Sequence, residues 1–194
     1  MDEKKFNNAI QLFDKANSSD PNTEYVNGKD YPKELLYAIR MTKKLNQIKP
    51  KASESVKLAA RCQHICRWEI PRDSFEMNRN GYLNWRRELK KFHSLKASEI
   101  LRQVGYDETL IDEVTFLLEK KQLKKNSDTQ LMEDIICLVF LEFYFENFSE
   151  KYSEEKLIDI IKKTWIKMSE KGRKSALRLN YSKKPKELLL RAIS

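Results

Sequence analysis

Scarcity of glycine and proline is the feature that most limits how this chain can fold. Four glycines and five prolines are spread over 194 residues, and charged residues make up 35% of the chain. This composition favours long helices joined by short turns. A chain of this length can bury one core, so we expect a single all-α domain over residues 1–194, built of about seven to eight helices.

Apolar residues recur at helical spacing through most of the chain, and caps and breakers set the bounds of each helix. We find no strand pattern of consequence and no internal repeat. The domain would comprise an N-terminal helix and loop over 1–30, a core over 31–148 and basic C-terminal helices over 149–194. The expected helices cover residues 3–17, 32–48, 53–70, 82–104, 108–121, 131–148, 154–170 and 185–193, with a further short helix after Gly172.

Two features of the sequence indicate a cytoplasmic protein. No apolar run is long enough to cross a membrane, and the N-terminus lacks the apolar core of a signal peptide. The three cysteines, Cys62, Cys66 and Cys137, are an odd number within expected helix interiors. We therefore expect reduced, buried thiols.

The net charge of +9 is concentrated at the C-terminal end of the chain. Residues 151–194 contain thirteen Lys and Arg against five Asp and Glu, a net of +8. Such a surplus could attract nucleic acid or an anionic substrate. No nucleic-acid-binding motif accompanies it, so a solvated helix surface is favoured and an RNA-associated factor is the lesser hypothesis.

Polar side chains interrupt the inward face of the helix expected over 53–70. The spacing places His64 and Arg67 on one face with Ala60, and Gln63 lies beside His64. A neutral polar group that is buried without a partner costs on the order of 2–7 kcal/mol. This cluster therefore needs hydrogen-bond partners, ions or a ligand, and it is the first candidate site.

The helix expected over 82–104 supplies a second histidine. His93 lies on its inward face, and the same stripe meets Arg86 and Tyr82 toward the helix start. A histidine and an arginine thus share the face that we expect to point toward the core.

The helix expected over 131–148 is apolar nearly all round, so we expect it to be buried. A carboxylate within such a helix needs a cation, a metal or a set of hydrogen-bond donors. Asp134 is the main case, and the argument extends to Glu142 and more weakly to Glu133.

Four long motifs support a family resemblance. They are Gln63–Arg72, Gly81–Arg86, Glu133–Glu142 and Lys163–Ser169. These motifs resemble those of the family known as domain of unknown function 4202, and the similarity covers nearly the whole chain. The resemblance implies a family without an assigned reaction.

The order of elements is also similar to that of the HD superfamily of helical metal-dependent phosphohydrolases. In that superfamily one helix carries a His-Asp pair, later helices add histidines, and a final helix adds an aspartate. Gln63-His64, His93 and Glu133-Asp134 stand at the corresponding points, with Gln63-His64 in place of the His-Asp pair. The resemblance implies an HD-like architecture. It also implies a divalent metal, Mn, Fe, Zn or Mg, bound by His64, His93 and Asp134.

Under this hypothesis His64, Glu133 and Asp134 are the catalytic candidates. Guanidinium and ammonium groups suit phosphate oxygens, whereas the aromatic rings could line a ligand pocket or pack in the core. A buried network of ion pairs that only fixes helix packing would explain the same residues. The substrate-binding candidates are Gln63, Arg67, Trp68, Arg72, Tyr82, Arg86 and Lys121.

The leading functional hypothesis is a metal-dependent phosphohydrolase that acts on a small phosphorylated compound or nucleotide. The alternative is a non-catalytic binding module that senses a nucleotide or another anion through the same pocket. The expected partner is a small anionic ligand rather than a membrane, and the sequence does not indicate an oligomeric state.

Overall fold

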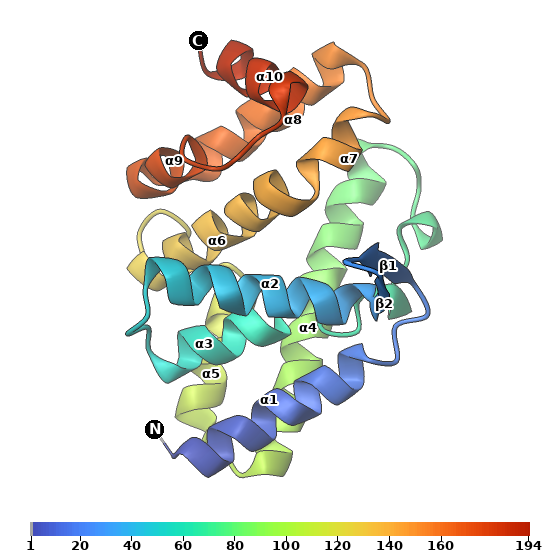
Figure 1. Ribbon diagram of the computed structural model, residues 1–194. Coiled ribbons are helices and arrows are strands. Elements are labelled where there is room, and N and C mark those ends of the chain that lie inside the picture. The colour runs from blue at the N-terminus through green and yellow to red at the C-terminus, as the bar shows by residue number, and fades with distance from the viewer. Residues whose placement is uncertain (1) are drawn as a thin grey trace. The chain divides into compact units, whose positions relative to one another are not determined.

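The computed structural model describes residues 2–194, and it confirms the all-α class. Ten α-helices and one two-stranded sheet lie within these residues (Figure 1). The chain divides into two compact units, with unit 1 ending at Lys121 and unit 2 running from Gln122 to Ser194. The grouping into residues 1–30, 31–148 and 149–194 stays a prediction.

Unit 1 is built from five helices around an apolar core. Helix α3 packs against α1, α2 and α5, and α4 packs against α1 and α5. Phe13, Met41, Leu58 and Leu101 are fully buried between these helices. The elements are α1 Glu3–Asn17, β1 Thr23–Val26, β2 Lys29–Pro32, α2 Lys33–Ile48, α3 Glu54–Cys62, α4 Arg79–Val104 and α5 Glu108–Leu118, with 3-10 turns at Arg67–Glu69 and Arg72–Ser74.

Unit 2 has a second core of its own. Helix α6 packs against α7, α8 and α9, and α10 packs against α7 and α8. Leu138, Phe145, Leu157 and Leu188 are buried among these helices. The elements are α6 Ser127–Phe143, α7 Phe145–Ser149, α8 Glu154–Lys167, α9 Glu170–Ala176 and α10 Lys183–Ile193.

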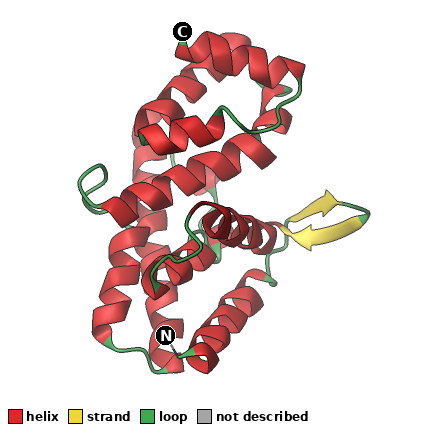
Figure 2. Ribbon diagram, turned by 60° about the vertical axis from the view of Figure 1, so that its left-hand side comes forward, coloured by secondary structure: helices red, strands yellow, loops and turns green. Residues whose placement is uncertain are grey.

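The hairpin formed by β1 and β2 is absent from the sequence-based expectation. Figure 2 shows its two strands projecting from the helices of unit 1. Asn27 and Gly28 have φ angles of 51° and 81°, which suit the tight turn between paired strands. An ion pair of 2.7 Å between Arg40 and Glu24 links the hairpin to α2. The Asn-Gly pair was the signal that could have identified it.

The helix expected over 53–70 ends early. Helix α3 stops at Cys62, and the chain turns through residues 63–66 with Cys66 in the left-handed region at φ 52°. The expectation that Ala60, His64 and Arg67 share one helical face is therefore wrong. Backbone groups in this turn find partners on other helices, which replaces the hydrogen bonds that a longer α3 would make.

Two C-terminal helices also differ from expectation. The helix expected over 131–148 is broken at Tyr144, whose φ of −121° separates α6 from α7. The helix expected over 154–170 ends at Lys167, and the following short helix begins at Glu170, before Gly172.

The cysteines and the hydropathy of the helices agree with the sequence analysis. Cys62, Cys66 and Cys137 are buried thiols. Among residues 2–194, no helix combines the length and the apolar character needed to span a membrane.

Gly81 allows the loop before α4 to fold closely against the helix start. The Asn78 side chain accepts a hydrogen bond of 2.8 Å from the backbone N–H of Gly81. A Cβ atom at Gly81 would lie 2.8 Å from the carbonyl carbon of Glu76 and closer still to its oxygen. Because the obstacle is backbone, a side chain here forces the loop to move.

We predict that Gly81→Ala lowers the free energy of unfolding by about 1–3 kcal/mol, the range typical of overpacked sites. Asn80→Ala is the matched control, because Asn80 is exposed in the same helical turn. Its effect should stay within about 0.5 kcal/mol. Urea unfolding measures both, and equal stability of the two variants would contradict the close approach.

Candidate functional site

The turn after α3 is held by side chains from two other helices. Nδ1 of His93, on α4, lies 2.8 Å from the carbonyl oxygen of Ile65, so this nitrogen carries the proton and donates it. The Asn17 side chain, at the end of α1, accepts a hydrogen bond of 3.0 Å from the N–H of Cys66. These bonds satisfy backbone groups that lack helical partners and thereby fix the position of His64.

His64 lies between two other rings. It stacks on Tyr37 of α2 with ring centroids 4.2 Å apart and an interplanar angle of 11°. The ring of His93 is 5.8 Å away on another side. One turn before Tyr37, Glu34 places a carboxylate oxygen 3.5 Å from Nδ1 of His64. The predicted pair of histidines is thus brought together, beside a carboxylate that the sequence analysis missed.

Burial keeps both imidazoles uncharged. It lowers the pKa of His93 to about 3, with a smaller contribution from His64. The pKa of His64 also lies well below its ordinary value, first through burial and then through the positive charges of Arg67, Arg86 and Lys120. Burial raises the pKa of Glu34, which Arg67 partly opposes. Two neutral imidazoles therefore lie side by side at pH 7.

Three adjacent polar side chains have unused hydrogen-bonding capacity. Oε1 of Gln63, Nδ1 of His64 and Nε2 of His93 are buried and form no hydrogen bond with any of residues 2–194. Each such atom costs free energy of folding, on the order of 1–3 kcal/mol. Buried polar atoms of this kind are rare in folded proteins, and they commonly mark a place where water or a ligand binds.

The positive charges of two arginines, Arg67 and Arg86, act on His64. Nη1 of Arg67 is 3.7 Å from Glu34, and its guanidinium carbon lies 5.2 Å from the centre of the Trp85 ring. Arg86 is half-buried and close enough to lower the pKa of His64. Within residues 2–194 the Arg86 guanidinium forms no hydrogen bond or ion pair. Its donors are therefore available to an anion.

Two other predicted cations have partners elsewhere in unit 1. Arg72 donates hydrogen bonds of 3.0 Å and 2.7 Å to the carbonyl oxygens of Phe75 and Glu76, so it orders the loop before α4. Lys121 is exposed and pairs with Glu119 at 2.9 Å.

The predicted aromatic candidates differ in exposure. Trp68 is half-buried on the 3-10 turn that follows His64. Tyr82 is 45% exposed, and its ring lies 5.9 Å from that of Trp85. Trp85 is itself buried, and its indole N–H donates a 2.9 Å hydrogen bond to the carbonyl oxygen of Ile70.

In unit 2, Asp134 is satisfied by hydrogen-bond donors. One carboxylate oxygen accepts from Gln130 at 3.0 Å and from the backbone N–H of Ser169 at 2.8 Å. The other accepts from the hydroxyl group of Ser169. Asp134 thereby fixes the start of α9 next to Gly172, where a Cβ atom would lie 2.6 Å from the Asp134 carboxyl carbon.

The other two acidic candidates on α6 differ from each other. Glu133 is buried. Glu142 is exposed, so the expectation that it lies within the apolar interior is wrong. Its position near the end of α6 keeps its carboxylate accessible to solvent.

Helix α2 contains residues of the site that sequence reasoning did not select. Glu34, Tyr37, Met41 and Lys44 are buried, and their spacing of three, four and three residues places them on one face. A carboxylate and an ammonium group on the inward face of an amphipathic helix were the available signal.

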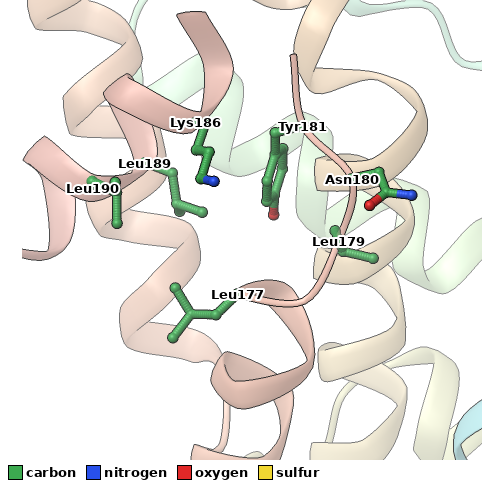
Figure 3. A pocket seen from close by; sticks show the side chains of 7 residues that line it. All are labelled: Leu177, Leu179, Asn180, Tyr181, Lys186, Leu189 and Leu190. Atoms are coloured by element: carbon green, nitrogen blue, oxygen red, sulfur yellow. The ribbon is translucent and has the colours of Figure 1, made fainter. Parts of the chain in front are cut away.

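None of the candidates named from the sequence lines the pocket in unit 2. It has a volume of about 370 Å³, and the side chains of Tyr181, Lys186 and Leu189 point toward its interior (Figure 3). The residues that line it are Leu177, Leu179, Asn180, Tyr181, Lys186, Leu189 and Leu190.

Comparison with known families settles the membership of the chain. Residues 7–189 match the family described as Domain of unknown function (DUF4202). The chain belongs to this family. No curated protein and no solved structure matches this DUF4202 protein. The comparisons give no support to the HD-superfamily resemblance, so the HD-like architecture stays a prediction.

The residues of this DUF4202 protein do not fit the predicted metal set. No group of three or more His, Cys, Asp and Glu side chains among residues 2–194 is arranged to hold a metal ion. Asp134 already accepts three hydrogen bonds from Gln130 and Ser169. We therefore derive no chemical step through a metal at His64, His93 and Asp134.

Neutral burial of His93 predicts a loss of stability in acid. Its pKa is about 3 in the folded protein and near 6.5 in the unfolded chain, so the unfolded state binds more protons between these values. Stability should fall as the pH decreases from 6.5, by up to about 1.4 kcal/mol per pH unit for each such histidine. The raised pKa of Glu34 offsets part of this loss, because the folded protein binds a proton at Glu34 at a higher pH than the unfolded chain does.

His93→Asn tests this prediction, because the Asn amide can still donate to Ile65 but does not titrate. Urea unfolding between pH 5 and 6.5 measures the slope of unfolding free energy against pH. This slope should decrease by up to about 1.4 kcal/mol per pH unit, which corresponds to one proton. An unchanged slope would contradict a neutral His93.

Proposed function

We propose that this DUF4202 protein binds a small phosphorylated compound or nucleotide at an anion site formed by Arg67 and Arg86 beside His64. The half-buried Arg86 carries the proposal, because its guanidinium has no hydrogen bond or ion pair within residues 2–194. Guanidinium groups offer paired N–H donors that match phosphate oxygens. A phosphate bound here would accept hydrogen bonds from the Arg86 guanidinium.

Charge balance supports the same ligand class. Arg67, Arg86 and Lys120 all raise the positive potential at His64, whereas Glu34 is the carboxylate in contact with that ring. The pKa of Glu34 is itself raised, which weakens its ability to neutralise the cations. An anionic ligand would complete the balance at partly desolvated groups, where charge pairing is stronger than in bulk water.

Phosphohydrolysis by the same site is the second candidate, and the contact between Glu34 and His64 favours it. An ionised Glu34 stabilises the tautomer with the proton on Nδ1, 3.5 Å from its carboxylate oxygen. Nε2 then has a free lone pair, and the His64 side chain is 19% exposed. A neutral imidazole oriented by a carboxylate can accept a proton from an attacking water molecule.

Calorimetric titration with inorganic pyrophosphate tests the anion site. We expect Arg86→Gln to weaken binding by about tenfold, because a hydrogen bond to a charged group contributes roughly 1.5–3 kcal/mol. Arg87→Gln is the matched control, since Arg87 is exposed, hydrogen-bonds to Asn84 and should leave the affinity unchanged within about twofold.

Equal affinities of the two variants, or no binding by the unmodified protein, would overturn the proposal. An assay of phosphate release, with and without Mn²⁺ or Mg²⁺, then separates the two candidates. Turnover that disappears in His64→Gln while pyrophosphate binding remains supports hydrolysis. Binding without turnover under any of these conditions supports the binding module.

A further inference from the structure

We infer that the ligand of the anion site is a nucleotide whose base stacks on the exposed ring of Tyr82. This inference rests on the proposed function, because it places the phosphate at Arg67 and Arg86. It adds the rings of Tyr82 and Trp85 at the start of α4, which together we call the aromatic surface.

The two rings of the aromatic surface have different environments. Trp85 is buried, and its indole N–H is fixed to the carbonyl oxygen of Ile70. Tyr82 rests against it at a centroid distance of 5.9 Å and an interplanar angle of 48°, with 45% of its surface exposed. The buried indole therefore supports an accessible ring. Such a ring loses little conformational entropy when a base stacks on it.

Exposed apolar side chains flank Tyr82 in the sequence. Met77 is 78% exposed and Leu83 is 54% exposed. Single exposed apolar residues are common on protein surfaces, but three within seven residues form an uncommon concentration. The backbone contact between Glu76 and Gly81 holds the loop containing Met77 close to the helix start. A planar base could cover this surface, whereas a sugar phosphate would leave it in water.

The aromatic surface is continuous with the anion site through Arg67. The guanidinium of Arg67 lies 5.2 Å from the centre of the Trp85 ring, and its Nη1 is 3.7 Å from the Glu34 carboxylate beside His64. Arg86 follows Tyr82 by four residues in α4, so the two side chains lie on the same helical face. Arg86 and the ring of Tyr82 thus lie one helical turn apart, which matches the phosphate and base of one nucleotide.

Titration with AMP, ribose 5-phosphate and adenosine tests the inference. We expect AMP to bind roughly tenfold tighter than ribose 5-phosphate, the order of effect of one base stacked on an aromatic ring. Tyr82→Ala should bring this ratio close to one without weakening ribose 5-phosphate, and Tyr82→Phe should preserve it. Tyr25→Ala is the matched control, because Tyr25 is 71% exposed on the hairpin.

The outcomes separate the two proposals. If AMP and ribose 5-phosphate bind the unmodified protein equally, the nucleotide inference is overturned and the anion site stands. If neither binds, the nucleotide inference fails, and the pyrophosphate titration decides whether the anion site stands. An AMP preference that survives in Tyr82→Ala overturns the role of Tyr82, and a loss of ribose 5-phosphate binding in that variant shows a structural effect instead of stacking.

Discussion

The hydrogen bond from His93 to the carbonyl oxygen of Ile65 is the interaction on which the candidate site depends. Helix α3 ends at Cys62, and the chain must leave it with its carbonyl groups satisfied. Because His93 donates at 2.8 Å, the turn can hold Cys66 at positive φ and present His64 toward Tyr37 and Glu34. The second nitrogen of His93 remains buried without a hydrogen-bond partner among residues 2–194. His93 therefore stabilises the turn through Nδ1 and places Nε2 next to the site.

Electrostatics gives the site its chemical character. Burial removes the charge of both histidines, so the positive potential arises from guanidinium and ammonium groups instead of imidazolium. Asp134 in unit 2 illustrates the opposite case, since donors from Gln130 and Ser169 satisfy its carboxylate fully. A buried polar group whose partners are all present has a structural explanation. The Arg86 guanidinium has no such partner within residues 2–194, and the proposed anion site therefore lies there.

Sequence patterns predicted the helices well where local signals decide. The first two helices were predicted to within a residue at each end, since caps, breakers and apolar spacing agree there. The end of α3 was not predictable in this way, because it depends on Asn17 and His93, which are distant in sequence. The HD-superfamily resemblance implied that His64 and His93 lie together, and their ring centroids are 5.8 Å apart. Glu34 was missed because the residues around it follow the pattern of an ordinary amphipathic helix. The partners of Asp134 were not predictable, because a buried carboxylate requires hydrogen-bond donors but does not specify which residues supply them.

Imidazole nitrogen NMR tests the central claim most directly, because the chain contains only two histidines. Spectra at pH 7 and pH 5.5 should show two neutral rings, with the proton of His93 on Nδ1 at both values. Addition of pyrophosphate should shift the nitrogen signals of His64 more than those of His93, since His64 adjoins the guanidinium groups. The account would be contradicted by a His93 that titrates near its ordinary pKa or carries its proton on Nε2. A His64 signal that does not respond to pyrophosphate would contradict it equally.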